Sequence, residues 1–265
     1  MGYAIRTGAG RFVVVDGGLA NDAEPFVSLL EQYAEGKPEI DLWIITHPHS
    51  DHYGALAVIA RDQSLRERIS VRRLCMRMPH EDTVYTGKGA AMPGDVRIIR
   101  ALGEAFGVPN LTAAAGDLYT VDDVMVRVLL TVADLADVTD PNETSMIFRV
   151  EVAGQSILFL GDTYSRPSRQ LAQEMGEALK CDFCQLAHHA LNGGADELYA
   201  LARPEVALIP MARPAYDAML FGEYRESHGT RHNRHVMQSL HEARRWISAD
   251  GDRVVELPYD FSQLP

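Results

Sequence analysis

The segment Thr46-His47-Pro48-His49-Ser50-Asp51-His52 constrains this chain more than any other. It places three imidazoles and one carboxylate within six positions, directly after the apolar run Leu42-Trp43-Ile44-Ile45. Neutral imidazole and carboxylate are common ligands of zinc and similar divalent ions. A rigid strand that ends in a ligand-rich loop can aim such groups at one point. The segment therefore predicts a metal site in preference to a merely polar loop.

This segment supplies only part of what a metal site needs. One ion takes three or four protein ligands, and two ions about 3.5–4 Å apart need a bridging carboxylate as well. His47 and His49 are two residues apart and can present to the same side. Asp51 and His52 follow in a tighter geometry and address a second position. Further ligands are therefore expected at the ends of other strands.

Three other apolar runs end in suitable residues. Residues 156–160 run into Gly161-Asp162, whose carboxylate is a candidate bridge between two ions. Residues 181–187 run into His188-His189, and residues 12–15 run into Asp16, which could orient a metal ligand by a hydrogen bond. Spacing does not decide between the tandem histidines. We favour His188 as the ligand, leave His189 to the substrate, and expect Asp51 and His189 to take part in the chemistry.

The alternation of apolar runs and turn residues predicts an α/β protein. Each half carries a β-rich hairpin region followed by alternating strands and helices, so two facing sheets with helices outside are expected in one domain, 1–265. The predicted strands are 3–6, 11–15, 41–45, 69–76, 117–120, 124–130, 146–152, 156–160, 181–186, 205–210 and 253–257. The predicted helices are 22–35, 54–61, 93–106, 167–179, 195–202 and 232–248, and residues 78–95 are expected to be irregular.

Composition limits the location and the partners. No apolar run is long enough to span a membrane, the N-terminal residues resemble no signal peptide, and three cysteines suggest no disulfide framework, so a cytoplasmic protein is expected. Cys181 and Cys184, three apart on a predicted strand, should face opposite sides as core thiols. The net charge of −12 favours a small molecule or a phosphodiester over nucleic acid as the substrate, without excluding nucleic acid. The arginines of 61–77 are read as solvated faces, and His80 as a surface residue or one lining a cleft.

The set Asp16, His47-x-His49-x-Asp51-His52, Gly161-Asp162 and His188-His189 resembles the metallo-β-lactamase-fold hydrolase superfamily over essentially the whole chain. The resemblance implies a four-layer αββα sandwich with a metal site at one edge of its two mixed sheets. It implies that His47 and His49 hold a first ion, and that Asp51, His52 and one of the tandem histidines hold a second. Asp162 would bridge the two ions.

Within that superfamily, Asn142-Glu143-Thr144-Ser145 before Gly-Asp and His-His is similar to the hydrolase domain of competence-type DNA-uptake channels. It is also similar to phosphorylcholine esterases of the fold. The stretch 231–235 resembles the turn that opens their last helix, which makes His232 a candidate substrate contact. The superfamily usually has a histidine about twenty residues before the bridging aspartate, where this chain has Asn142. Because an amide is a poorer zinc ligand than imidazole, the His47–His49 site is expected to be the weaker one.

These observations predict a metal-dependent hydrolase that uses metal-activated water on a phosphodiester or related ester. One or two zinc ions are expected, with manganese or iron as alternatives. Hydrolysis of a thioester, lactone or amide is the alternative within the same chemistry. A weakly metallated, non-catalytic binding module is the alternative outside it.

Overall fold

The computed structural model of the protein describes residues 1–83, 85, 93–211, 213–221, 240 and 242–263. The chain divides into two compact units, Met1–Met146 and Ile147–Pro265. Each unit combines strands of a mixed β-sheet with helices, so the predicted α/β class with two mixed sheets is confirmed. The single domain over 1–265 stays a prediction.

The sheet of the first unit has the strand order β1-β2-β3-β5-β6, with β4 also paired to β3. β1 is antiparallel to β2, and the other pairs are parallel. An antiparallel hairpin of β7 and β8 follows in the chain. The strands are β1 Gly2–Arg6, β2 Phe12–Asp16, β3 Glu39–Ile45, β4 Ser70–Val71, β5 Leu74–Met76, β6 Asn110–Thr112, β7 Leu118–Val121 and β8 Val124–Leu130.

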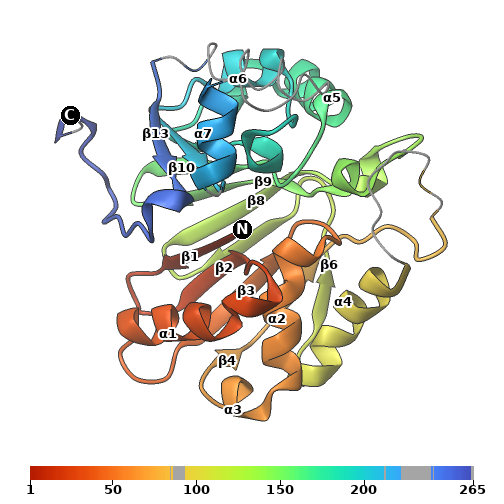
Figure 1. The fold of residues 1–265 in the computed structure, drawn as a ribbon, viewed down its shortest axis with the longest axis vertical. Coiled ribbons are helices and arrows are strands. Elements are labelled where there is room, and N and C mark those ends of the chain that lie inside the picture. The colour runs from red at the N-terminus through yellow and green to blue at the C-terminus, as the bar shows by residue number, and fades with distance from the viewer. Residues whose placement is uncertain (84, 86–92, 212, 222–239, 241, 264–265) are drawn as a thin grey trace. The chain divides into compact units, whose positions relative to one another are not determined.

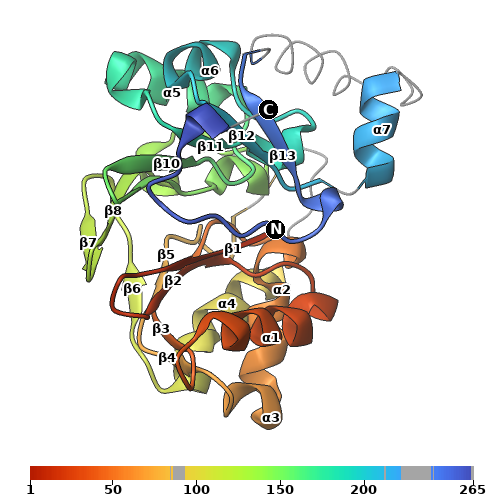
Figure 2. The ribbon, with the colours of Figure 1, turned by 90° about the vertical axis from the view of Figure 1, so that its left-hand side faces the viewer.

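Four helices of this unit gather on one side of its sheet (Figures 1 and 2). They are α1 Ala23–Tyr33, α2 Ser50–Arg61, α3 Gln63–Arg66 and α4 Pro93–Phe106. Their apolar faces and the sheet form one buried cluster in which Trp43, Leu56 and Ile99 are fully enclosed. Burial of one such large side chain stabilises the fold by about 1.5–3 kcal/mol. This cluster fixes the strand ends from which Asp16 and His47 emerge.

The second unit has the strand order β13-β12-β11-β10-β9. β9 and β10 form an antiparallel hairpin through Ala153-Gly154, both with positive φ, as a two-residue hairpin turn requires. The other pairs are parallel. The elements are β9 Ile147–Val152, β10 Gln155–Phe159, α5 Ser165–Met175, β11 Phe183–Gln185, α6 Asp196–Ala202, β12 Val206–Ile209, α7 Arg213–Phe221 and β13 Arg244–Ile247.

The C-terminal region differs from the sequence-based expectation. The helix predicted over 232–248 is wrong at 244–247, which form β13 in parallel register with β12. Residues 232–239 and 241 of that predicted helix lie outside the described residues. The mixture of arginine and apolar residues suits a helix face equally well, and pairing with β12 decides for a strand. The strand predicted over 253–257 is also wrong, because this segment has no strand structure and is largely exposed.

Two further expectations are settled inside the units. The predicted strand 69–76 is divided into β4 and β5. Cys181 and Cys184 are buried and free of disulfides, as expected of core thiols. However, Cys181 precedes β11, so strand alternation does not separate the two thiols, and a hydrogen bond to Cys181, together with burial, raises the pKa of Cys184. In the part of the chain that is described, no helix is long and apolar enough to cross a membrane.

Candidate metal centre

Helix α2 begins inside the histidine-rich segment. It starts at Ser50 rather than at the predicted Gly54, so Asp51 and His52 lie in its first turn. His49 keeps extended backbone angles, and its carbonyl accepts hydrogen bonds from the backbone N–H groups of His52 (3.0 Å) and Tyr53 (3.3 Å). An acidic residue such as Asp51 is favoured in a first helical turn by the helix dipole. The candidate ligands are therefore held by a strand end and a helix start.

Asp16 orients the His52 ring through a hydrogen bond with Nδ1. The Asp16 carboxylate is fully buried at the end of β2 and accepts a hydrogen bond from His52 Nδ1 at 2.8 Å. It also accepts from the backbone N–H of Thr46 at 2.9 Å and from the Thr46 hydroxyl at 2.9 Å. Trp43 Nε1 donates to the Asp16 carbonyl at 2.7 Å. The position is the one expected of a residue that fixes the orientation of a histidine ligand.

His47 and His49 lie beside His52 within the first unit. The ring of His47 is 4.1 Å from that of His52 and 4.8 Å from that of His49, centroid to centroid. The hydroxyl of Thr46 lies 3.1 Å from His47 Nδ1. Thr46 thus contacts both Asp16 and His47, a role that the sequence reasoning missed. The only signal for it was a hydroxyl side chain between a buried strand and the first histidine.

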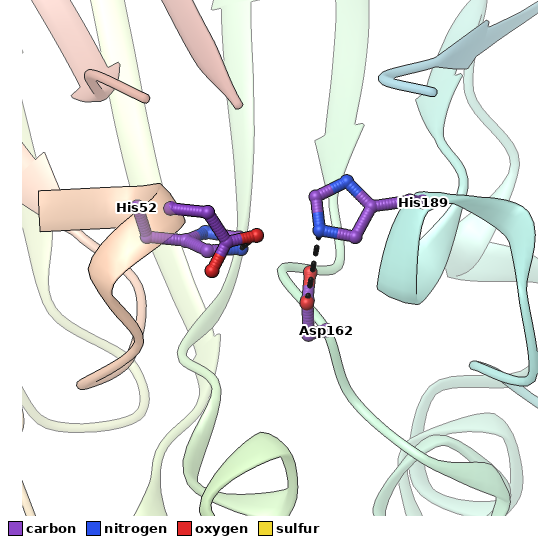
Figure 3. Close-up of side chains that lie close together, drawn as sticks. His52, Asp162 and His189 are labelled. Carbon is purple, nitrogen blue, oxygen red and sulfur yellow. Dashed lines mark ion pairs between the residues drawn. The ribbon is translucent and has the colours of Figure 1, made fainter. Parts of the chain in front are cut away.

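In the second unit, Asp162 and His189 lie together. Asp162 is buried just after β10, and its Oδ2 is 3.4 Å from His189 Nε2 (Figure 3). His189 Nδ1 lies 2.7 Å from the carbonyl oxygen of Pro210. A carbonyl only accepts hydrogen bonds, so Nδ1 carries the proton and Nε2 carries the lone pair. Nothing in the sequence pointed to Pro210.

The other tandem histidine has different contacts. His188 Nδ1 bonds with the Asn192 side-chain oxygen, and its ring packs 5.4 Å from that of Tyr164. The sequence favours His188 as the ligand, whereas in the structure His189 lies next to Asp162. The contact of His188 with Asn192 also gives a local role to the Ala190–Gly194 segment that follows the histidines.

The turn that carries these histidines has an unusual backbone. His188, His189 and Ala190 have φ values of 51°, 54° and 60°, in the left-handed region that non-glycine residues rarely adopt. Tyr199, fully buried in α6, holds the turn by accepting a hydrogen bond from the backbone N–H of Ala187 at 3.1 Å. Such strain persists where the surrounding structure over-determines the conformation.

The donor geometry fits a divalent cation. His52 and His189 each have Nδ1 committed to an acceptor, and each presents Nε2 to a carboxylate, at 3.6 Å from Asp51 and 3.4 Å from Asp162. A lone pair facing a carboxylate oxygen is repulsive unless a proton or a cation lies near both. Two ligand atoms, each about 2.1 Å from a tetrahedral ion, are roughly 3.4 Å apart. Each unit therefore contains an imidazole–carboxylate pair with metal-ligand spacing.

The candidate ligands come from both units. They are His47, His49, Asp51 and His52 in the first unit and Asp162 and His189 in the second (Figure 3 labels His52, Asp162 and His189). Asn142 is buried in the short 3-10 turn Pro141–Thr144 of the first unit. The turn is followed by Met146, whose N–H donates to the Thr46 carbonyl at 3.0 Å. His232, the predicted substrate contact, lies outside the described residues.

Two mixed sheets with helices, and imidazole and carboxylate groups at the strand ends, define an α/β protein with a candidate metal site. The family model of the metallo-beta-lactamase superfamily matches residues 2–212, and the chain belongs to that superfamily. The match runs through both units and includes every candidate ligand named above.

Solved structures share the fold at low sequence identity. The metallo-beta-lactamase fold protein YhfI from Bacillus subtilis is 11% identical with a TM-score of 0.55, covering 93% of this chain and 87% of YhfI. The diiron beta-hydroxylase CmlA from Streptomyces venezuelae is 15% identical with a TM-score of 0.53, covering 92% of this chain and 51% of CmlA. This chain thus spans about half of CmlA. No curated protein matches the sequence.

Proposed function

We propose that this protein is a metal-dependent hydrolase that acts on a phosphodiester or a related ester. The observation that carries the proposal is the paired geometry of His52 with Asp51 and of His189 with Asp162, each imidazole fixed through Nδ1. Membership of the superfamily supports it, because the superfamily consists mostly of metal-dependent hydrolases.

The position of each candidate residue in the fold indicates the role that it would have. His47, His49, Asp51 and His52 would hold metal from the first unit, and Asp162 and His189 from the second. Asp16 and the Pro210 carbonyl would keep the lone pairs of His52 and His189 on Nε2. His188, beside Tyr164 and Asn192, would contact the substrate. When bound, a divalent ion supplies Lewis acidity that lowers the pKa of a water ligand to about 7 and polarises the ester oxygen.

The nature of the metal is part of the proposal. Imidazole and carboxylate ligands suit zinc, manganese and iron. We propose zinc first, with the Asp51–His52 position occupied more tightly than the His47–His49 position, because Asn142 stands where a histidine is usual. Manganese or iron would suit a centre richer in oxygen ligands.

The substrate class is inferred from the sequence pattern. The order Asn142–Ser145, Gly161-Asp162, His188-His189 is similar to that of competence-type DNA-uptake channels and phosphorylcholine esterases, which supports a phosphodiester. The net charge of −12 favours a small molecule over a nucleic acid. We propose a cytoplasmic location on the sequence features given above, with no membrane partner.

Two substitutions test the proposal. Asp51→Ala and Asp162→Ala should each remove bound metal and abolish hydrolysis of bis(p-nitrophenyl) phosphate, because each deletes the carboxylate of one pair. Metal content is measured by elemental analysis after purification without chelator, and activity with zinc and manganese separately. Asp82→Ala, at an exposed carboxylate, is the control and should behave as the wild type. Full activity in either test variant would contradict the mechanism.

The substrate and metal screens separate the alternatives. Hydrolysis of a thioester, lactone or amide without hydrolysis of the phosphodiester would agree with the proposed metal centre but contradict the proposed substrate class. The buried Asn142 favours a second candidate, a weakly metallated binding module. Absence of stoichiometric metal in the purified protein, together with no hydrolysis after zinc or manganese is added, would favour that function.

A further inference from the structure

A cavity of about 490 Å³ lies in the first unit, beside helix α4 and the strand ends of β5 and β6. Figure 1 shows α4 and β6 side by side. The cavity is lined by Met76, Arg77, Met78 and His80 after β5, by Arg100 of α4, and by Asn110 and Thr112 of β6. None of the candidate metal ligands lines it. Its volume lies within the range of small-molecule binding sites.

The lining carries positive charge and no carboxylate. Among the described residues, no ion pair engages Arg77 or Arg100, whereas the neighbouring Arg68, Arg72 and Arg73 all pair with acidic side chains. Arg77 is only partly exposed. The prediction that the arginines of 61–77 lie on solvated faces therefore does not hold for Arg77. In a chain of net charge −12, a partly buried guanidinium without a counter-ion indicates an anion site.

The nearby carboxylates of Glu81 and Asp82 pair with residues other than Arg77 and Arg100. Glu81 is partly exposed and lies 3.9 Å from Arg97, outside the lining, and the exposed Asp82 lies 3.5 Å from His80, so neither carboxylate pairs with Arg77 or Arg100. Arg100 is held in place because its Nη2 donates to the Pro79 carbonyl at 3.0 Å. The Arg100 carbonyl accepts from Asn110 Nδ2 at 2.7 Å. One face of the guanidinium is thus anchored while its other N–H groups remain available to a ligand.

The rest of the lining suits the apolar part of an organic ligand. Met76 and Met78 are at least nine-tenths buried and form an apolar, polarisable wall. Thr112 adds a hydroxyl at the strand end. Guanidinium groups bind phosphate and carboxylate through paired hydrogen bonds. An apolar wall beside two guanidinium groups therefore selects a ligand that has an apolar part and one oxyanionic group.

The cavity is close to the histidine-rich segment within the same unit. Met76 pairs in register with Ile45, two residues before His47, and Thr112 pairs with Met76. Neighbouring strands are about 4.8 Å apart, so β6 lies roughly 10 Å from β3. One substrate can span that distance. Ligands of α/β proteins bind at the carboxyl ends of parallel strands, where both features lie.

We propose that this cavity binds the phosphate or carboxylate group at the distal end of the substrate, through Arg77 and Arg100. Its role as a substrate subsite rests on the proposed hydrolase function, whereas anion binding does not. The subsite selects esters that carry a second oxyanion besides the group that is hydrolysed.

The binding test uses the full-length chain freed of metal with a chelator. Phenyl phosphate, benzoate and the neutral benzyl alcohol are titrated by isothermal calorimetry. One or both anions should bind saturably and benzyl alcohol should not, and the stronger anion identifies the preferred group. Arg77→Ala and Arg100→Ala should each weaken binding by about tenfold or more, as loss of a charge-assisted pair predicts. The control Arg97→Ala, on the same helix but outside the lining, should leave binding unchanged.

The controls separate this inference from the proposed function. Asp51→Ala should keep anion binding, so a failure of hydrolysis leaves the anion site measurable. If hydrolysis is found, Arg77→Ala should raise KM about tenfold for a phosphodiester with a distal carboxylate and leave KM unchanged for bis(p-nitrophenyl) phosphate. No saturable anion binding, equal binding of benzyl alcohol, or an equal loss in Arg97→Ala would overturn the anion site. Equal effects on both substrates would overturn the subsite.

Discussion

At the scale of single residues, the two histidines with assigned tautomers are held by unlike acceptors. His52 donates through Nδ1 to the buried carboxylate of Asp16, and His189 donates to the backbone carbonyl of Pro210. Both acceptors keep the lone pair on Nε2, but only the carboxylate adds charge that raises the basicity of the ring. His52 is therefore expected to be the stronger ligand, in agreement with the expected tighter Asp51–His52 position.

The Asp16 carboxylate gives a direct test of this orientation. In Asp16→Asn, an amide NH2 group replaces one carboxylate oxygen, and because it only donates hydrogen bonds the side chain cannot accept from both the Thr46 N–H and His52. We expect metal affinity to fall about 10–100-fold. Stability should fall by about 1–3 kcal/mol, because buried donors lose an acceptor. Competition titration with a chromogenic chelator measures the affinity, and urea denaturation measures the stability.

The matched control for Asp16→Asn is Asp82→Asn, which makes the same chemical change at an exposed carboxylate. It should alter neither quantity. Unchanged metal affinity in Asp16→Asn would show that the hydrogen bond to His52 does not tune the site.

The tandem histidines are distinguished by single substitutions. His189→Ala should lower metal stoichiometry, because it removes the imidazole that lies 3.4 Å from Asp162. His188→Ala should keep the metal and lose activity, because its ring contacts Asn192 and Tyr164 instead. Elemental analysis of both variants, purified side by side, provides the measurement. Metal loss in His188→Ala alone would restore the sequence-based preference for His188.

At the scale of elements, the turn after β11 is held by its neighbours in the second unit. A methyl group on Gly193 would lie 2.6 Å from the carbonyl carbon of Ala187 and 2.7 Å from its oxygen. Tyr199 contacts both ends of this turn, since its hydroxyl accepts a hydrogen bond from the Ala187 N–H and lies 3.4 Å from the Gly193 carbonyl oxygen. Burial raises the pKa of Tyr199, so the hydroxyl stays protonated and can donate to that oxygen. Gly193 is thus a packing requirement of the turn.

Gly193→Ala is expected to destabilise the protein, because the close atoms belong to the backbone and cannot rotate away. Overpacking of this kind costs about 1–3 kcal/mol. Metal stoichiometry should also fall, because His189 is displaced with the turn. Urea denaturation and elemental analysis are the two readouts.

Gly94→Ala, in α4, is the control for this substitution because nothing lies within 4 Å of its added methyl group. It should be neutral or stabilise by up to about 1 kcal/mol, as alanine is the better helix former. Equal stability of Gly193→Ala and the wild type would show that the turn relaxes easily.

At the scale of the whole molecule, the candidate ligands are divided between two compact units. A ligand that binds only the native state stabilises it by about 2.7 kcal/mol at a hundred times its Kd. Trp43 belongs to the first unit and Trp246 to the second. In Trp246→Phe, fluorescence therefore reports the first unit alone.

Removal of metal is expected to lower the denaturation midpoint of the whole chain. The chelator should shift the far-UV circular dichroism transition and the Trp43 fluorescence transition of Trp246→Phe together, if residues 1–265 form one domain. Asp162→Ala, which lacks a ligand of the second unit, should be insensitive to chelator. Separate transitions would contradict the single domain, and an unchanged midpoint in the wild type would contradict stoichiometric metal.

The sequence by itself determined the strand ends that carry Asp16, His47 and Asp162. Buried strands are continuous apolar runs, and a polar residue directly after such a run marks its end. The sequence also determined the α/β class and the superfamily. The His-x-His-x-Asp-His signature is local, and this chain contains it with the spacing typical of the superfamily. Local patterns were therefore sufficient where the signal lies within a few residues.

Only the tertiary structure decided the features that depend on distant contacts. The Pro210 carbonyl selects the tautomer of His189 from 21 residues away, and Thr46 contacts Asp16 across 30. Residues 244–247 become a strand because β12 offers them a parallel edge. The pattern of a short segment cannot show which partner it will meet, since hydrogen bonds between remote residues form only once the chain has folded.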